Sequence, residues 1–403
     1  MERIWTTELA AHTGERVRLA GWLHHLRVLS NVSFLVLRDA KGLAQVVVEE
    51  RSLAERLARL RHETVLSVQG LAVTAPQAPG GYEVHGPEVE ILSSAEAPPP
   101  LDLRRPTLSV PLPQMLDHAP VALRHPRARA VFRLSAAAVE GFRTTMRNLD
   151  FVEIQTPKIV AAATESGANV FRLDYFGRPA FLAQSPQFYK QSMVGVFERV
   201  FETGPVFRAE PHDTPRHLNQ YLSLDAEMGF ITDHTTVMEV VTAAVRGMLV
   251  AVGERCPAEL SLLGLDLPGV PEHIPVVHFR DALAMVGEAT GRDLEAEPDL
   301  APDHERWLGE WVRRAHGSEF LFVTGYPMQK RPFYTHPDPA RPAYSNSFDL
   351  LFRGLELVTG GQRLHRHGDY LAALAARGLP AEPFAGYLEA FRHGMPPHGG
   401  FAL

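Results

Sequence analysis

The chain has 403 residues, a formal net charge of −7 and one cysteine. A single cysteine excludes an intrachain disulfide and a cysteine-rich zinc site, and the negative charge argues against a general nucleic-acid binder without excluding a local basic surface. The 45% hydrophobic content fits two or three globular domains, and since we see no signal peptide and no apolar run near the about 18 residues of a membrane span, we expect a cytoplasmic protein without a membrane partner.

The first 97 residues contain short runs that alternate like β-strands, with a helical stretch at 53–60 after the third run. The runs are 16–23, 33–39, 44–48, 65–73 and 82–85, and residues 88–92 close the set. Five strands with a helix after the third predict an OB-type barrel, and another small barrel or sandwich is the alternative.

A proline-rich stretch follows at 98–127, where we expect a hinge without core elements, because proline fixes φ and removes a donor. Apolar residues at helical spacing then predict a long helix over 130–148. The predicted domains are therefore 1–97, the hinge 98–127 and 128–403. The last of these shows neither βαβ regularity nor a glycine-rich nucleotide motif, and 252–310 reads as a weakly patterned connector.

Four polar clusters interrupt apolar surroundings in the last domain. The first, 151–159, reads as a strand ended by Pro157. In the second, 181–191, a strand runs into Ser185-Pro186-Gln187, a good helix start. Lys190 shares a face of that helix with Gln187 and opposes the helix dipole. An anionic partner for Lys190 is therefore expected, and an exposed surface lysine is the alternative.

The third cluster, 206–230, reads as a hairpin with a cationic loop. The loop carries Arg208, Glu210, His212, Arg216 and His217. A guanidinium group can donate two parallel hydrogen bonds to phosphate oxygens, so the loop is a candidate phosphate site. A solvated charged hairpin is the alternative.

The fourth cluster, 346–363, consists of two strand-like apolar runs that contain charged residues. These residues are Asp349, Arg353, Glu356 and Arg363. Two carboxylates with a nearby hydroxyl fit Mg²⁺, which takes few protein oxygens together with substrate phosphates. An internal salt-bridge network is the alternative.

The first cluster, the third cluster and the chain end resemble motifs 1, 2 and 3 of class II aminoacyl-tRNA synthetases. Together with 184–190 and 354–363, they resemble the archaeal-type aspartyl-tRNA synthetases. The resemblance implies an α+β fold: a five-stranded OB-fold barrel that binds the anticodon, then a catalytic domain with an antiparallel sheet flanked by helices. Residues 230–321 leave too little room for the extra domain of the bacterial type. It further implies ATP-dependent ligation of L-aspartate to tRNA through aspartyl-adenylate, with Mg²⁺, in a homodimer whose interface includes Pro157.

The same resemblance assigns roles to particular residues. On the ATP side they are the catalytic Arg208 at the α-phosphate, Glu210, Arg216, His217, Leu218 and Glu356. For aspartate they are Glu165, Ser185, Gln187, Lys190, Arg208, Asp225, Thr359 and Arg363. For the metal they are Asp349, Glu356 and Thr359, where Thr359 stands in place of the usual Ser.

Aspartate is favoured over asparagine, because the asparagine enzymes lack the lysine at the position of Lys190. Lys190 and Arg363 supply two cations, which a neutral amide would leave uncompensated. Asparaginyl-tRNA synthetase remains the alternative.

The choice of tRNA is expected to depend on the barrel, where Trp22, Phe34 and Tyr82 are either base-stacking platforms or core residues. Enzymes that charge only tRNA-Asp tend to carry Trp and Lys at the positions of His24 and Pro79. These two residues therefore resemble the relaxed type, which charges tRNA-Asp and tRNA-Asn and supplies a tRNA-dependent amidotransferase.

The sequence departs from the family at 394–403, where motif 3 would continue into Gly-x-[Glu/Asp]-Arg and a closing helix. Either the chain is clipped or the protein is truncated, and truncation would impair adenylation. A non-catalytic tRNA-binding or scaffold protein is therefore a further alternative.

Overall fold

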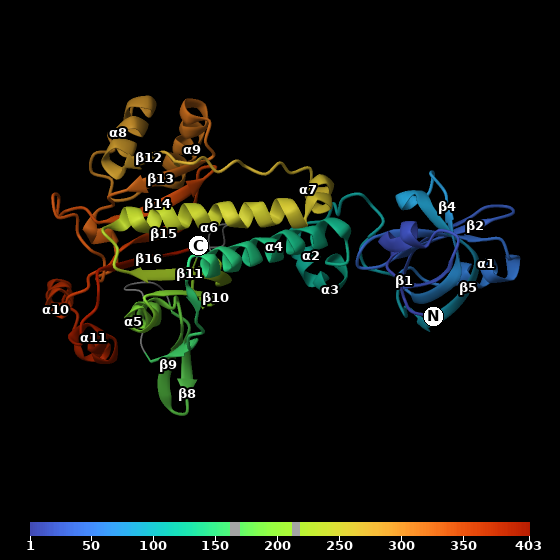
Figure 1. Cartoon of the computed structure of the whole chain (residues 1–403), viewed down its shortest axis with the longest axis horizontal. Coiled ribbons are helices and arrows are strands. Elements are labelled where there is room, and N and C mark those ends of the chain that lie inside the picture. Colours follow the sequence, from blue (N-terminus) through green and yellow to red (C-terminus); the bar gives the residue numbers. More distant parts are fainter. Residues whose placement is uncertain (162–169, 212–217) are drawn as a thin grey trace. The chain divides into compact units, whose positions relative to one another are not determined.

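The computed structural model describes residues 1–161, 170–211 and 218–403, and it divides into two compact units, Met1–Phe132 and Arg133–Leu403 (Figure 1). The first unit is built on a closed barrel with the strand order β1-β2-β3-β5-β4. Its strands are β1 Arg16–Val28, β2 Ser33–Arg38, β3 Leu43–Val48, β4 Val65–Thr74 and β5 Tyr82–Ser93. Helix α1, Arg51–Ala58, follows β3, so the predicted barrel is confirmed.

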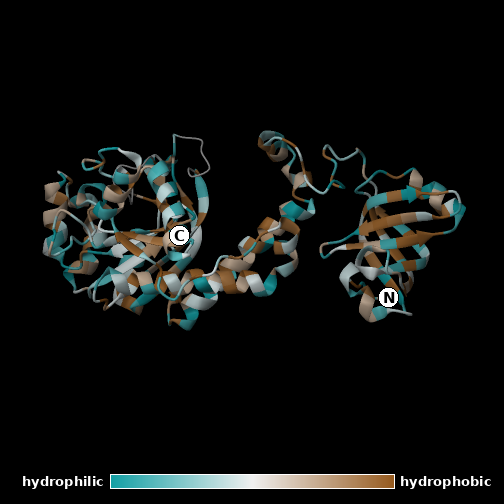
Figure 2. Ribbon diagram, turned by 90° about the horizontal axis from the view of Figure 1, so that it is seen from above, coloured by the Kyte–Doolittle hydropathy of each residue, from teal (hydrophilic) through white to brown (hydrophobic). Residues whose placement is uncertain are grey.

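Alternating hydrophobic residues fill the barrel, and they recur in brown along its strands in Figure 2. Leu35, Leu37, Val46 and Val68 are fully buried there. The predicted runs 82–85 and 88–92 are one continuous strand, β5. Short 3₁₀ helices at Thr6–His12 and Pro79–Gly81 complete the barrel unit.

The proline-rich stretch is more structured than expected. It contains α2 Leu112–Asp117 and α3 Ala119–Ala122, and Leu101 and Leu103 are buried. The expectation of no core element is wrong here, because proline is well suited to the first turn of a helix, where its missing N–H has no partner to lose. The predicted long helix is α4, Pro126–Asn148, which begins four residues earlier than expected and crosses the division between the units.

The second unit contains an eight-stranded sheet with the order β12-β13-β14-β15-β16-β11-β10-β6. Its strands are β6 Val152–Glu153, β10 Arg199–Phe207, β11 Gln220–Gly229, β12 Val276–His278, β13 Phe320–Thr324, β14 Ser347–Phe352, β15 Leu355–Gln362 and β16 His398–Ala402. Only the edge strands β6 and β12 pair in parallel, so the predicted antiparallel sheet flanked by helices is confirmed. A smaller sheet contains β7 Ile159–Val160, β8 Arg172–Tyr175 and β9 Arg178–Leu182.

Helices α4 and α6, His234–Arg255, cover one face of the large sheet (Figure 1). They approach so closely that a Cβ on Gly141 would lie 2.6 Å from the Gly247 carbonyl oxygen. Helix α6 contains an 18-residue window with a mean hydropathy of 1.6, so by length and composition alone it could cross a membrane, which was not expected from the sequence. Its residues Val237, Val241 and Ala244 are buried in the core on the sheet, which explains its apolar composition.

The opposite face carries α5 Gln187–Phe197, α8 Phe279–Thr290 and α9 Pro302–His316. The segment expected to be a weakly patterned connector, 252–310, therefore supplies α8 and the start of α9, as well as β12 and α7 Pro257–Leu263. Helices α10 His367–Ala376 and α11 Ala385–Arg392 form a separate aromatic core with Phe188 and Phe333. Short 3₁₀ helices lie at Met328–Lys330 and Glu382–Phe384.

Candidate active site

The strand register aligns polar residues from distant parts of the sequence in one row across the large sheet. Asp225 on β11 lies opposite Ala402, which lies opposite Thr359, which lies opposite Asp349 on β14. On the other side, Asp225 lies opposite Glu202 of β10. Because directly opposed side chains point to the same face of a sheet, the predicted aspartate and metal residues share one surface.

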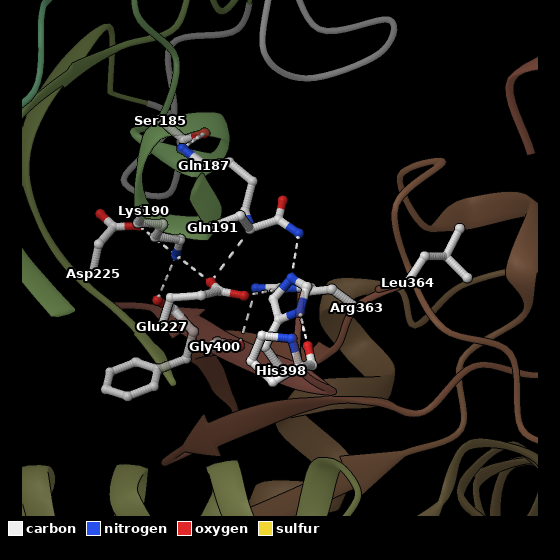
Figure 3. A network of polar contacts seen from close by, with 12 residues as sticks. Ser185, Gln187, Lys190, Gln191, Asp225, Glu227, Arg363, Leu364, His398 and Gly400 are labelled. Atoms are coloured by element: carbon white, nitrogen blue, oxygen red, sulfur yellow. Dashed lines mark hydrogen bonds and ion pairs between the residues drawn. The ribbon is translucent and has the colours of Figure 1, made fainter. Parts of the chain in front are cut away.

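Lys190 lies on the first turn of α5 and points toward this row of residues on the sheet (Figure 3). Its side chain is only 1% exposed, so the alternative of a surface lysine is wrong. The ammonium donates to Asp225 Oδ1 at 2.9 Å and to the Phe401 carbonyl at 3.0 Å. Asp225 also accepts a hydrogen bond of 2.6 Å from Ser223. The expected anionic partner of Lys190 is thus a residue of the protein.

Glu227 is the central residue of the site, and our sequence analysis missed it. It is fully buried and lies between Lys190, at 3.5 Å, and Arg363, whose Nε donates to it at 3.0 Å (Figure 3). Burial by itself would raise the pKa of Glu227, but the Arg363 guanidinium and the Lys190 ammonium outweigh it and lower the pKa. Its place two residues after Asp225 on β11 was the available signal, because such residues share a face.

These contacts correct one argument from the sequence. The positive charges of Lys190 and Arg363 are already compensated within the protein, because Asp225 and Glu227 form ion pairs with them. Gly400 makes room for this arrangement: a Cβ there would lie 2.1 Å from Glu227 Oε2. Both cations nevertheless point to the same buried carboxylate.

A second buried network fixes α5 from behind. The Gln191 amide donates to Tyr370 at 3.0 Å and to His398 Nε2 at 2.9 Å, and it accepts from Tyr387 at 2.8 Å. His398 Nδ1 lies 2.9 Å from the Pro396 carbonyl, so the ring donates there and accepts from Gln191. Burial lowers the pKa of His398 to about 4, which keeps the ring neutral at physiological pH.

The predicted amino-acid contacts Ser185 and Gln187 lie at the start of α5. Ser185 Oγ accepts from the Gln187 backbone at 3.3 Å, and the Gln187 side chain donates to Glu227 at 3.4 Å. The helix start predicted at Ser-Pro-Gln is therefore correct. The structure brings Gln187, Lys190, Asp225 and Arg363 together around Glu227.

The predicted hairpin of the third cluster is formed by β10 and β11. Arg208 follows β10, its backbone N–H donates to Asn219 at 3.0 Å, and its guanidinium lies 5.6 Å from the Tyr221 ring centre. Phe207 N donates to the Ala183 carbonyl at 3.0 Å, which places the loop base beside the start of the α5 segment. Glu210 is half-buried and Leu218 is exposed. Glu165, His212, Arg216 and His217 lie outside the described residues.

The predicted metal residues lie at the other end of the row. Thr359 donates to Asp349 Oδ1, and Arg331 donates to the same oxygen at 2.9 Å. The alternative of an internal salt bridge is therefore partly correct for Asp349, while Arg353 pairs with Glu319 on the surface. Arg331 was not predicted, because the segment between β13 and β14 has no regular pattern.

A β-bulge decides where Glu356 points. Leu350 pairs with Val358, but Leu351 pairs with Glu356, so Leu357 is an extra residue in β15. Strict alternation would put Glu356 and Thr359, three positions apart, on opposite faces. With the bulge, Glu356 shares the face of Leu351 and Asp349, and its charge acts on Tyr326 and Arg331 there.

This donor set fits a hard cation whose ligands come mainly from a substrate. Asp349, Glu356 and Thr359 offer two carboxylates and one hydroxyl on one face, all oxygen donors. Among the described residues, no group of three or more His, Cys, Asp and Glu could hold a metal ion by itself. Mg²⁺ is typically held by one or two carboxylates together with phosphates, so the residues fit it.

The predicted tRNA-discriminating residues lie in the barrel unit. His24 is the extra residue of a bulge in β1, between Leu23 and His25. It is half-buried, its Nδ1 has no hydrogen-bond partner in the described structure, and burial with the nearby Arg38 guanidinium lowers its pKa to about 4. It lines a cavity of about 200 Å³ with His62 and the 98–104 segment. Pro79 is exposed at the turn between β4 and β5.

Among the candidate stacking residues, Trp22, Phe34 and Tyr82 are all half-buried. Arg38 lies 5.6 Å from the Trp22 ring and Arg27 lies 5.0 Å from the Phe34 ring, while Tyr82 packs on the barrel core. Core packing therefore describes Tyr82, and the other two rings are covered by guanidinium groups.

The sequence of this chain matches two known protein-family models. Residues 113–403 match the family described as tRNA synthetases class II (D, K and N), and residues 17–92 match the OB-fold nucleic acid binding domain. The chain belongs to the class II tRNA synthetases of this D, K and N group, with an OB-fold domain ahead of the synthetase domain.

Its relatives point to one member of that group. The chain is 45% identical to the aspartate–tRNA(Asp/Asn) ligase of Thermus thermophilus, over 100% of this chain and 93% of that protein. It is 36% identical to the aspartate–tRNA(Asp) ligase of Pyrococcus abyssi, over 97% and 90%. A solved structure of asparaginyl-tRNA synthetase from Pyrococcus horikoshii with asparaginyl-adenylate superposes with a TM-score of 0.92 at 28% identity, over 100% and 93%.

Proposed function

We propose that this protein is an aspartate–tRNA ligase that uses ATP and Mg²⁺ to activate L-aspartate and then charges tRNA-Asp and also tRNA-Asn. The observation that carries the proposal is the convergence of Lys190 and Arg363 on the buried carboxylate of Glu227. Two cationic side chains, one from α5 and one directly after β15, thus lie on either side of one buried carboxylate, next to the predicted aspartate contacts Gln187 and Asp225. The names of the relatives support the same reaction.

Selection of aspartate over asparagine follows from hydrogen-bond chemistry. Lys and Arg side chains are donors only, so both can donate to the two oxygens of an aspartate carboxylate. An asparagine amide has an NH2 group in place of one carboxylate oxygen. This group would face the N–H donors of Lys190 or Arg363, so buried donors would lack acceptors. The similarity in fold to an asparaginyl-tRNA synthetase makes asparagine the second candidate, but it does not account for the buried lysine.

On the nucleotide side, Arg208 is proposed to bind the α-phosphate and Glu210 to lie toward the adenine. Arg216 and His217 are proposed to lie near the phosphates, and Leu218, the next residue of the same run, also to contact ATP. Asp349, Glu356 and Thr359 would hold Mg²⁺, which when bound neutralises phosphate charge as the leaving group departs. The aspartate α-carboxylate attacks the α-phosphorus, and the bond to pyrophosphate breaks. The terminal ribose hydroxyl of tRNA then attacks the aspartyl carbonyl, and AMP leaves.

No protein nucleophile is required in either step, because the chain contributes positioning and charge. Glu165 is proposed to face the amino group of aspartate, and Ser185 and Gln187 to contact the amino acid. Asp225 holds the Lys190 ammonium through the bond of 2.9 Å.

The assembly is proposed to be a homodimer in the cytoplasm. Support comes from the motif around Pro157, where the edge strand β6 exposes Val152 and nearby Ile159 is also exposed. Relaxed tRNA choice would produce Asp-tRNA-Asn, which requires an amidating partner such as a tRNA-dependent amidotransferase. His24 and Pro79 are the residues proposed to permit this choice.

The test of amino-acid identity is ATP–pyrophosphate exchange with aspartate, with asparagine and with neither. Exchange with aspartate alone is expected. Exchange with asparagine would instead identify an asparaginyl-tRNA synthetase, and no exchange with folded protein would favour a non-catalytic tRNA-binding role.

The test of tRNA choice is aspartylation of purified tRNA-Asp and tRNA-Asn transcripts. Both are expected to accept labelled aspartate. Charging of tRNA-Asp alone would refute relaxed choice and leave the amino-acid assignment intact.

A further inference from the structure

Arg331 occupies the place where the metal ligands converge. It follows the 3₁₀ helix Met328–Lys330, and its two terminal nitrogens reach Asp349 Oδ1 at 2.9 Å and Thr359 Oγ1 at 3.3 Å. Thr359 itself donates to the same Asp349 oxygen. Asp349 Oδ1 thus accepts hydrogen bonds from the Arg331 guanidinium and from the Thr359 hydroxyl. Thr359 belongs to the proposed metal-binding residues, whereas Arg331 would compete with a metal ion for this oxygen.

The guanidinium is firmly held in this position. The Arg331 and Asp349 side chains are only 14% and 7% exposed, and the Arg331 Cζ lies 4.1 Å from the centre of the Tyr326 ring. The Arg377 side chain donates to the backbone carbonyl of Arg331 at 2.5 Å, which fixes the segment from the other side. An arginine guanidinium stays protonated in proteins, so this charge is permanent.

This arrangement sets the charge that an incoming cation meets. Asp349 and Glu356 together carry two negative charges, and Arg331 cancels one of them from within the protein. A divalent cation at Asp349 Oδ1 would have to displace a guanidinium hydrogen bond and would be repelled by the same group. Phosphate oxygens from a nucleotide would restore the missing negative charge and the missing ligands.

We propose that Arg331 is an internal counter-ion that keeps the Asp349–Thr359–Glu356 set closed to divalent cations until a nucleotide is bound. The inference rests on the proposed function for the identity of the set as a metal site. It makes Arg331 a positioning residue that couples metal binding to ATP, rather than a residue that touches the reacting atoms.

The test measures Mn²⁺ binding to the nucleotide-free full-length protein by the electron paramagnetic resonance signal of free Mn²⁺. Wild type is expected to bind weakly, and Arg331→Gln is expected to bind at least about tenfold more tightly, because a local positive charge is removed. Arg331→Lys, which keeps the charge, should resemble wild type. Arg353→Gln is the matched control, since its guanidinium pairs with Glu319 at the far end of β14.

Adding Asp349→Asn to Arg331→Gln should abolish the gained Mn²⁺ binding, which assigns it to this site. The proposal is overturned if folded Arg331→Gln binds Mn²⁺ no better than wild type, or if the gain survives Asp349→Asn.

If Arg331→Gln does not fold, the single variant Asp349→Asn, which keeps Arg331, still tests the proposal. Asp349→Asn alone should leave nucleotide-free Mn²⁺ binding unchanged and should weaken binding in the presence of ATP. A loss of nucleotide-free binding in Asp349→Asn would overturn the proposal. Failure of the proposed function is detected separately, by the absence of aspartate-dependent pyrophosphate exchange in wild type.

Discussion

At the scale of residues, the few lysines of this chain show what an ammonium does that a guanidinium does not. Of four lysines, Lys190 is fully buried and Lys158 is 21% exposed. Each makes a 2.9 Å ion pair with a carboxylate of the cross-strand row, Lys190 with Asp225 and Lys158 with Glu202. The Lys190 ammonium directs its donors to Asp225 and to the Phe401 carbonyl, which lie in different directions, as a compact charge with three donors allows.

Replacing Lys190 by Gln tests this role. The change leaves Asp225 and Glu227 short of a cation and removes a charged donor proposed for the substrate carboxylate. Loss of one partner of a buried charge pair weakens binding by about 3–4 kcal/mol, so we expect kcat/KM for aspartate in pyrophosphate exchange to fall by about 10²–10³. Lys41→Gln, an exposed lysine of the barrel unit, should have no effect. Adding Asp225→Asn should recover stability but not activity. Recovery of activity in the double variant would contradict the assignment of Lys190 to the substrate.

His398 predicts a dependence of stability on pH. Its folded-state pKa, about 4, lies below the ordinary 6.5, so the unfolded chain binds the proton more readily between these values. Stability is therefore retained above pH 6.5 and lost as the pH falls toward 4. We expect the free energy of unfolding to drop by about 2 kcal/mol from this residue between pH 7.5 and 5.

Urea unfolding of wild type and His398→Asn at these two pH values checks the expectation. The variant should lose less stability on acidification than wild type, and the exposed His393→Asn should lose as much as wild type. An equal loss in wild type and His398→Asn would show that His398 is not kept neutral by its surroundings.

At the scale of elements, α5 is held between the sheet in front and α10 and α11 behind. Gln191 makes the rear contacts to Tyr370, Tyr387 and His398, while the preceding residue, Lys190, makes the front contacts. The two networks thus share one turn of helix. Loosening the rear network should displace the ammonium that faces the substrate pocket.

Gln191→Leu tests this coupling. It removes one hydrogen bond each from the buried Tyr370, Tyr387 and His398 and leaves the His398 Nε2 acceptor without a donor, so the free energy of unfolding should fall by about 2–4 kcal/mol and KM for aspartate should rise. Denaturant unfolding and pyrophosphate exchange measure the two effects. Gln329→Leu, the same change at an exposed position, should alter neither. A loss of stability at an unchanged KM would show that the rear network does not position Lys190.

At the scale of the whole molecule, the chemistry and the choice of tRNA are assigned to different units. His24 and Pro79 belong to the unit Met1–Phe132, whereas every residue of the Glu227 cluster belongs to Arg133–Leu403. Changes in the barrel should therefore affect tRNA steps and leave adenylate formation alone.

The double variant His24→Trp with Pro79→Lys tests this division. Aspartylation of tRNA-Asn should fall about tenfold or more relative to tRNA-Asp, because relaxed and strict recognition differ by only a few contacts. Pyrophosphate exchange without tRNA should stay within about twofold of wild type, because His24 and Pro79 belong to a different compact unit from the Glu227 cluster. Equal charging of both tRNAs by the double variant would remove His24 and Pro79 from the account of tRNA choice.

The sequence by itself determined those elements that have a strong local pattern, and several of the charged side chains of the site. Local alternation predicted the barrel strands and the β10–β11 hairpin, and turn chemistry predicted the start of α5 at Gln187, because these signals depend on neighbours along the chain. The resemblance to a family identified Lys190 and Arg363, which the structure brings to one carboxylate.

Only the tertiary structure decided how the charges of the site are balanced. Glu227 lies between Lys190 and Arg363, which come from distant parts of the sequence. The bulge at Leu357 places Glu356 on the same face as Asp349. Arg331, which pairs with Asp349, comes from an irregular segment. None of these is a local property, since pairing between strands is set by the packing of the whole sheet. A pocket that carries two buried cations is stable without its substrate because the fold supplies their counter-ions.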